Sequence, residues 1–219
     1  MTGAPLAGTT LRILLVDDHP VVRLGLRHLL ADAFASATIQ EGGSAAEAMA
    51  LVTREAWDVV ILDLTLPDGS GLDVLKQIRS AYPRLPVLIL SIHTVDQFGR
   101  RALAAGASGY VTKDAADAEL VTAVTRVIRG GKHFDTAVLE HIALGLHPDG
   151  MGPPHERLSD REYQVLRMIG SGRTVSQVAA ELKLSIKTVS TYRARVLEKM
   201  DMRTNAELIH YSVRAGLSE

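Results

Sequence analysis

The sequence predicts an α/β domain with a doubly wound, five-stranded parallel sheet, followed by a small all-α domain. In the first 130 residues, short runs of Val, Ile and Leu alternate five times with segments of helical spacing. That alternation is typical of a parallel sheet with helices on both faces. Beyond residue 156 only segments of helical spacing occur, which indicates a separate helical domain.

The first domain is expected at residues 10–130. Strong β-branched and Leu runs predict three strands, and weaker runs predict two more: 11–16, 59–62 and 87–90, then 37–40 and 109–111. Apolar residues at helical spacing predict the intervening helices at 21–33, 45–54, 71–81, 97–105 and 116–128. In sheets of this kind, ligands bind outside the carboxyl ends of the strands.

A change of composition follows the last of these helices. Gly130 and Gly131 end it, and HPDGMGPPHE at 147–156 collects Gly, Pro and polar residues. We therefore expect a linker over 131–156, with one short helix at 134–146. Residues 157–219 should form the second domain, with helices at 159–169, 175–182, 187–200 and 205–215.

Composition and charge exclude several classes of protein. Of the 219 residues, 47% are hydrophobic and 22% are charged, which excludes wholesale disorder. No apolar run approaches the ~18–20 residues of a membrane-spanning helix, and the first ten residues lack the features of a signal peptide. The absence of cysteine excludes disulfides and thiolate chemistry. We expect a cytoplasmic protein that does not bind membranes.

The two parts of the chain differ in charge. Residues 1–154 hold 13 Lys and Arg against 17 Asp and Glu, whereas residues 155–219 hold 11 against 8. An acidic first part and a mildly basic second part suggest two different roles.

Polar side chains follow the expected strands where each one ends. Asp17 and Asp18 directly follow the first strand, and Asp63 ends the third. Three neighbouring carboxylates repel one another and require a cation, and such oxygen ligands suit Mg²⁺. Ser91 and Lys113 follow the fourth and fifth strands. Together these groups can hold a phosphoryl group, with the metal and Lys113 neutralising its oxygens and one Asp as acceptor.

Each of these residues also has a purely structural interpretation. An Asp-Asp pair after a strand commonly forms a turn or caps a helix, and a single Ser or Lys is commonly solvated. Five suitable residues at suitable strand ends are improbable by chance. Their conjunction favours the functional interpretation.

Four segments resemble the signature segments of bacterial receiver domains: VDDHP at 16–20, DLTLPDGSG at 63–71, LSIH at 90–93 and GASGYVTKDA at 106–115. The resemblance covers about residues 11–129 and implies a CheY-like receiver fold. It implies that Asp63 accepts a phosphoryl group from a histidine kinase. It also implies that Asp17 and Asp18, with Asp63, hold Mg²⁺.

The same resemblance implies a conformational switch. Lys113 would contact the phosphate, and Ser91 would turn toward it and draw Tyr110 inward. One departure lies in LPDGSG at 66–71, where the family more often has a Met before the Pro. There Asp68 adds an acidic group, which we expect near the pocket with an effect on the lifetime of the phosphoryl group.

The stretch LKLSIKTVS at 182–190 predicts a helix-turn-helix, with the second helix beginning at Lys187. A plain helical hairpin explains the same pattern about equally well. One face of the second helix is small and polar with basic margins, which suits contact with base edges and flanking phosphates. The candidate DNA-binding residues are Lys187, Thr188, Ser190, Thr191, Ala194 and Arg195.

LSDREYQVL at 158–166, this helix pair and RVLEKMDMRTNAELIHY at 195–211 resemble the LuxR-type DNA-binding domain. A receiver joined to that domain is the layout of the NarL/FixJ class of response regulators. The resemblance implies dimerisation on DNA through the last helix, with Asn205, Leu208 and Ile209 as candidate contacts. It implies a bacterial transcription factor, not an enzyme. Its partners would be promoter DNA, a cognate histidine kinase, a second copy of the chain when phosphorylated or on DNA, and RNA polymerase.

Three other functions fit part of the sequence. An Mg²⁺-dependent phosphohydrolase with an aspartyl nucleophile often carries a second Asp two residues after the first, where this chain has Thr65. A DNA-binding protein whose receiver serves only for dimerisation is disfavoured by the complete set of pocket residues. A protein-interaction adaptor is disfavoured by the helix-turn-helix.

Overall fold

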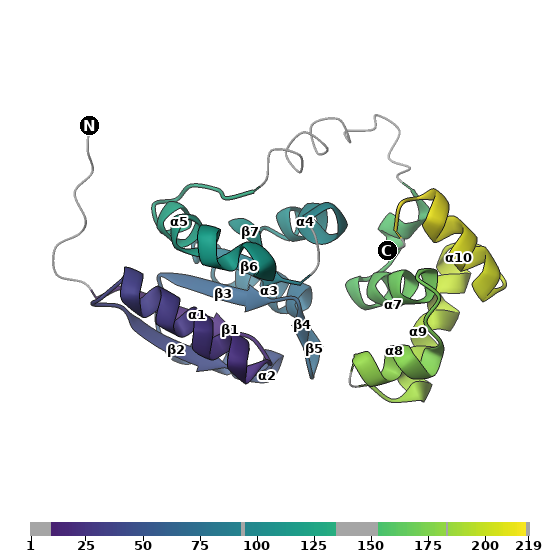
Figure 1. Cartoon of the computed structure of the whole chain (residues 1–219), viewed down its shortest axis with the longest axis horizontal. Coiled ribbons are helices and arrows are strands. Elements are labelled where there is room, and N and C mark those ends of the chain that lie inside the picture. Colours follow the sequence, from purple (N-terminus) through teal and green to yellow (C-terminus); the bar gives the residue numbers. More distant parts are fainter. Residues whose placement is uncertain (1–9, 93–94, 135–152, 183, 218–219) are drawn as a thin grey trace. The chain divides into compact units, whose positions relative to one another are not determined.

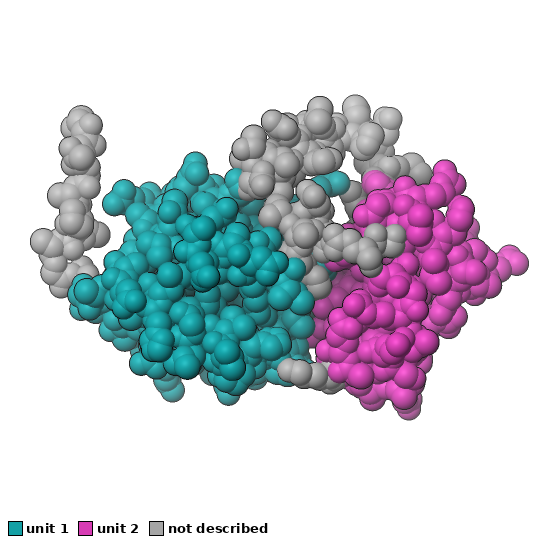
Figure 2. All heavy atoms as spheres, viewed as in Figure 1, with its two compact units in different colours: residues 1–143 teal, residues 144–219 magenta. Residues whose placement is uncertain are grey.

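The structure is a computed structural model that describes residues 10–92, 95–134, 153–182 and 184–217. The chain forms two compact units, residues 1–143 and residues 144–219 (Figure 2). The division falls within residues 131–156, where we expect the linker. Residues 135–146 of the expected short helix lie outside the described residues, so the domain boundaries stay a prediction.

The first unit is built on a five-stranded parallel sheet, which confirms the predicted fold class (Figure 1). Its strands are β1 (Arg12–Val16), β2 (Thr38–Gly42), β3 (Val59–Asp63), β6 (Val87–Ser91) and β7 (Gly109–Thr112). They pair in the order β2-β1-β3-β6-β7, and every pairing is parallel. The order reverses between β1 and β3, which is where ligands of doubly wound sheets bind.

Helices cover both faces of this sheet (Figure 1). On one face, α1 (Pro20–Ala33) and α5 (Ala116–Ile128) pack on the strands through fully buried side chains such as Leu30 and Leu120. The other face carries α2 (Ala45–Arg54), α3 (Gly71–Ala81) and α4 (Val95–Ala104). Because both faces are covered, the strands are apolar at successive positions, which is why the sequence shows them as continuous runs.

Two short elements lie beside the strand ends and have no signal in the sequence. A two-stranded antiparallel hairpin, β4 (Thr65–Leu66) and β5 (Gly69–Ser70), directly follows β3. A 3-10 turn, η1 (Lys113–Ala115), follows β7. Elements of two or three residues are too short to give a periodic pattern. The hairpin brings the start of α3 back to β3, where the Gly71 amide donates to the Leu64 carbonyl at 2.8 Å.

The second unit is helical throughout its described residues, as predicted. A 3-10 turn, η2 (Pro154–Arg157), precedes α7 (Asp160–Gly170), α8 (Val175–Glu181), α9 (Ile186–Lys199) and α10 (Asn205–Arg214). Each helix begins after a Ser or Thr whose side chain accepts a hydrogen bond from the backbone amide three residues on. The helix starts predicted from helical spacing lie within one residue of these capped starts.

Tight packing holds α7 against α10 in this unit. A Cβ atom on Gly170 would lie 2.3 Å from Ser212 Oγ, so only glycine allows the two helices to approach this closely. Val165, Leu166 and Leu208 are fully buried around this contact. In the part of the chain that the structure describes, no helix is long and apolar enough to cross a membrane.

Candidate functional site

The structure gathers three of the predicted residues into one buried pocket. Asp17 follows β1 and Asp63 ends the neighbouring β3, and their side chains are almost fully buried. Lys113 Nζ lies 2.7 Å from Asp63 Oδ2 and 2.6 Å from Asp17 Oδ2. A single ammonium group therefore joins the ends of two neighbouring strands to a residue that lies far along the chain from both.

Burial and charge act against each other at these groups. Burial raises the pKa of the Asp63 carboxyl to about 6, although the Lys113 ammonium opposes the rise. Burial favours the neutral amine at Lys113, but Asp63 and Asp17 outweigh it and raise the pKa of Lys113 above 10.5. Lys113 is therefore charged at neutral pH, and any additional cation beside Asp63 would favour its carboxylate form.

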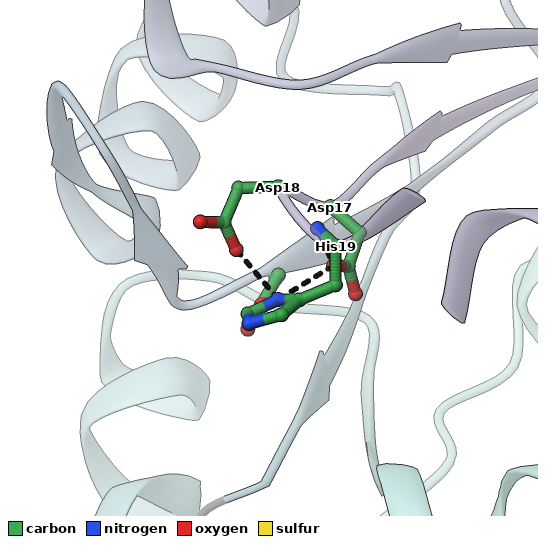
Figure 3. A group of neighbouring side chains, drawn as sticks. Asp17, Asp18 and His19 are labelled. Carbon is green, nitrogen blue, oxygen red and sulfur yellow. Dashed lines mark hydrogen bonds and ion pairs between the residues drawn. The ribbon is translucent and has the colours of Figure 1, made fainter. Parts of the chain in front are cut away.

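His19 extends the pocket toward solvent, and sequence reasoning missed it. Its Nδ1 lies 2.6 Å from Asp18 Oδ1 and 3.2 Å from Asp17 Oδ1, and Figure 3 shows the ring turned toward both carboxylates. The His19 amide also donates to Asp17 Oδ1 at 2.8 Å. The sequence does contain a signal for this contact. His19 lies two residues after Asp17 at a helix start, and an Asp side chain often accepts a hydrogen bond from the backbone amide two residues on.

The donor set fits the Mg²⁺ ion that we expect here. Asp17, Asp18, His19 and Asp63 each offer one ligand atom, and these atoms lie within 4.8 Å of one another. The three carboxylates supply the hard oxygen ligands that Mg²⁺ prefers. They also exceed the single positive charge of Lys113, so a divalent cation would balance the pocket.

The two predicted switch residues are buried on adjacent strands. Ser91 ends β6, next along the chain from Leu90, which pairs with Asp63. Tyr110 lies in β7 opposite Ile89 and is 2% exposed. The structure therefore places Ser91 at the same edge of the sheet as Asp63, and it places the Tyr110 ring in the interior.

Asp68 has a structural role that the sequence analysis did not predict. Its carboxylate accepts hydrogen bonds from the Ala45 and Ala46 amides at 2.7 and 2.9 Å. These are the first amides of α2, where an acidic group is favoured by the unpaired backbone donors and the helix dipole. Asp68 thus caps α2 across the loop, and its expected effect on the lifetime of the phosphoryl group stays a prediction.

The candidate DNA-binding residues lie on α9, the second helix of the helix-turn-helix. Val189 and Val196 bury one side of this helix in the core of the unit. The Ser185 hydroxyl caps its start by accepting from the Thr188 amide at 3.0 Å. The other side is open to solvent, with Thr188 half-buried and the remaining candidates exposed: Lys187, Ser190, Thr191, Ala194 and Arg195.

One of the predicted dimerisation residues needs correction. Leu208 is fully buried in the core of its own unit, so it does not offer a surface to a second chain. Asn205 is half-buried and its side chain accepts a hydrogen bond from Arg193 on α9. On the exposed side of α10 lie Ile209 and Val213, which are 36% and 62% exposed, and Val213 was missed by sequence reasoning.

Comparison with known proteins identifies both units. The receiver domain of response regulators matches residues 13–125, and the luxR family of bacterial regulatory proteins matches residues 156–212. The transcriptional activator protein ExaE of Pseudomonas putida is 39% identical over 94% of this chain and 97% of its own length. The response regulator UvrY of Escherichia coli K12 is 33% identical over 94% of this chain and 95% of its own length.

Solved structures are similar to the chain as well. A LuxR-family two-component response regulator from Aurantimonas sp. SI85-9A1 is 38% identical, with a TM-score of 0.57 over 62% of this chain and 97% of that chain. RcsB from Salmonella enterica serovar Typhimurium, solved bound to the promoter P1flhDC with the phosphomimetic BeF3⁻, is 26% identical. Its TM-score is 0.60 over 93% of this chain and 98% of that chain.

Proposed function

The chain belongs to the response regulators of the NarL/FixJ class, and we propose that phosphorylation of Asp63 controls its binding to promoter DNA. The observation that carries this proposal is the buried triad of Asp17, Asp63 and Lys113. A structural ion pair needs one acid and one base. Here a second acid is buried beside the first, which is costly unless a further cation binds, and such a pocket of acids, ammonium and cation can hold a phosphoryl group on Asp63.

The phosphoryl donor in this proposal is a phosphohistidine of a cognate histidine kinase. An Asp63 carboxylate oxygen attacks phosphorus, so that a P–O bond forms and the P–N bond breaks. The phosphohistidine ring is protonated on its other nitrogen and therefore leaves as a neutral imidazole. Lys113 binds the transferred oxygens while remaining protonated. Asp17 and Asp18, with Asp63, would hold Mg²⁺, which neutralises charge on the transferring group when bound.

The proposed response begins at the edge of the sheet beside Asp63. The phosphoryl group adds negative charge, and the Ser91 hydroxyl at the end of β6 can turn toward it and donate a hydrogen bond. Movement of that loop leaves space that an inward Tyr110 fills. The Tyr110 ring already lies in the interior, so the proposal is that phosphorylation favours this inward position over an outward one.

The proposed output is DNA binding by α9 in the major groove. Its exposed hydroxyl and methyl groups can approach base edges, while Lys187 and Arg195 neutralise phosphates. Two chains joined through α10 would bind paired half-sites with a raised effective concentration. The promoter-bound state of RcsB supports DNA as the partner. The similarity to ExaE, a transcriptional activator, supports activation, with RNA polymerase as a further partner in the bacterial cytoplasm.

The test is DNA binding to genomic fragments with and without acetyl phosphate and Mg²⁺. We expect affinity to rise in the phosphorylated wild type and not in Asp63→Asn. Asp68→Asn is the matched control, because Asp68 is a nearby carboxylate whose oxygens bind the start of α2. An Asp63→Asn variant that responds to the phosphodonor like the wild type would show that Asp63 is not the switch.

A further inference from the structure

The chain returns to the sheet immediately after α5. His133 forms a parallel bridge with Gly109 of β7. The His133 amide donates to the Ser108 carbonyl at 3.0 Å, and the His133 carbonyl accepts from the Tyr110 amide at 2.8 Å. We call residues 132–134 the edge segment, because β7 is the last strand of the sheet on this side.

Close packing and side-chain contacts hold the edge segment against β7. A Cβ atom on Gly109 would lie 2.6 Å from His133 O, so glycine is needed for the segment to approach β7. Lys132 Nζ donates to the Ala107 carbonyl at 2.7 Å. The His133 ring is 17% exposed and lies 3.5 Å from Glu119 on α5. The segment is thus held by backbone and side-chain contacts together.

The edge segment is bonded to the residue that the proposed switch moves. The Tyr110 amide binds His133 while the Tyr110 ring is buried in the interior. Helix α4 contacts β7 and so does α5, and the two helices cover opposite faces of the sheet. The remaining side of β7 is its backbone edge, which the edge segment occupies and where His133 binds the Tyr110 amide.

We propose that the edge segment is a clamp that couples Tyr110 to the beginning of the linker. With Tyr110 inward, the clamp closes on β7 and fixes where the chain toward the DNA-binding unit leaves the sheet. With Tyr110 outward, the clamp opens. Phosphorylation of Asp63 favours the closed clamp because it favours the inward ring. The inference rests on the proposed function and specifies how the signal leaves the receiver.

Amide hydrogen exchange of the full chain tests the clamp directly. The probe is beryllofluoride with Mg²⁺, compared with Mg²⁺ alone. We expect hydrogen exchange at the His133 and Tyr110 amides to slow by about fivefold or more when the probe is bound. A change of about fivefold corresponds to the net stabilisation from one backbone hydrogen bond. Unchanged exchange at His133 in a sample that binds beryllofluoride would overturn the clamp.

A pair of variants at His133 tests whether the clamp affects DNA binding. His133→Pro removes the amide that binds Ser108, whereas His133→Ala keeps both backbone bonds. We expect the rise in DNA affinity on phosphorylation to be about fivefold smaller in His133→Pro than in the wild type. The rise in His133→Ala should be close to that of the wild type. The extent of Asp63 phosphorylation reports that each receiver is folded.

The outcomes separate this inference from the proposed function. If the DNA affinity of the wild type does not rise on phosphorylation, the proposed function is contradicted. The hydrogen-exchange experiment still tests the clamp in that case. A wild-type gain that His133→Pro retains in full contradicts the clamp alone. An equal loss of this rise in affinity in His133→Pro and His133→Ala also contradicts the clamp, because the effect would then come from the His133 side chain and not from its backbone amide.

Discussion

Lys113 is the single residue on which the charge balance of the pocket depends. Its ammonium is shared by two buried carboxylates, Asp17 and Asp63, and their charges keep it protonated despite burial. The same ammonium limits the rise in the pKa of Asp63 to about 6. Without it, two like charges would face each other in a poorly solvated site.

We therefore expect Lys113→Met to lower the free energy of unfolding by about 3 kcal/mol in the absence of Mg²⁺, since it leaves buried charges unpaired. Saturating Mg²⁺ should recover part of that loss by binding the folded state. Urea unfolding of the full chain measures both. The control is Lys76→Met, whose side chain is 54% exposed and which should change stability by less than about 0.5 kcal/mol. Equal losses in the two variants would refute the assigned role of Lys113.

At the scale of elements, the junction of β3 and α3 positions the acceptor. A Cβ atom on Gly71, the first residue of α3, would lie 2.0 Å from the Asp63 carbonyl oxygen and 2.7 Å from Leu64 Cα. Both atoms belong to the backbone, so relief requires the start of α3 or the end of β3 to move. Glycine at 71 is therefore part of what holds Asp63 in place.

Gly71→Ala should destabilise the receiver by roughly 2 kcal/mol and reduce phosphorylation of Asp63, because overpacking a close backbone contact costs about 1–3 kcal/mol. Gly25→Ala is the opposite case, since Gly25 lies within α1 with open space around its Cα. That change should stabilise the protein by about 0.5–1 kcal/mol. Thermal unfolding and acetyl phosphate labelling would measure both variants, and a neutral Gly71→Ala would contradict the close contact.

The start of α7 carries a pH dependence of its own. Glu162 is buried, accepts from the Ser159 amide at 2.8 Å and pairs with Lys199 Nζ at 2.6 Å. Burial alone would raise the pKa of Glu162, but these hydrogen bonds outweigh it and lower the pKa below 4.5. A lowered pKa contributes stability above the unfolded value, and this stability is lost as the pH falls through the folded value.

We thus expect the melting temperature of the DNA-binding unit to hold down to about pH 5 and to fall below about pH 4.5, the range set by the unfolded carboxyl. Glu162→Gln should lower stability at neutral pH and flatten this acid dependence. Glu198→Gln, an exposed change on α9, should leave the acid dependence unaltered. Calorimetry of the full chain across pH 3.5–7 gives the comparison. The same acid slope in Glu162→Gln would exclude Glu162 as its source.

At the scale of the whole molecule, two compact units make one regulated DNA-binding protein. Ile209 and Val213 are exposed apolar residues on α10, whereas Leu208 belongs to the core. The distinction matters because a surface change alters association, and a core change alters folding.

Val213→Asp should therefore weaken binding to paired half-sites while binding to a single half-site stays the same, because the avidity of the dimer is lost. Its stability should change by less than about 0.5 kcal/mol. Leu208→Ala should instead lower the free energy of unfolding by roughly 2–5 kcal/mol. Titrations on DNA with one and two half-sites distinguish the two effects. Equal weakening on both DNAs by Val213→Asp would argue against dimerisation through α10.

Local patterns in the sequence determined the fold class of both units. Runs of Val, Ile and Leu in strands and the helical spacing of apolar residues involve only a few neighbouring residues, so they can be recognised without knowing which elements pack against them. The residues at the carboxyl ends of strands were predictable for the same reason. In a parallel sheet all strand ends meet at one edge, and Asp17, Asp63 and Ser91 were expected together.

Only the tertiary structure decided which of these groups touch. The bridge from Lys113 to both Asp17 and Asp63 depends on the order of the strands, and the cap that Asp68 gives to α2 depends on the path of a hairpin too short to leave a pattern. Burial of Leu208 and the bridge between His133 and β7 likewise depend on how distant segments pack. Such contacts depend on how whole helices and strands are placed relative to one another. A short stretch of sequence does not contain that information.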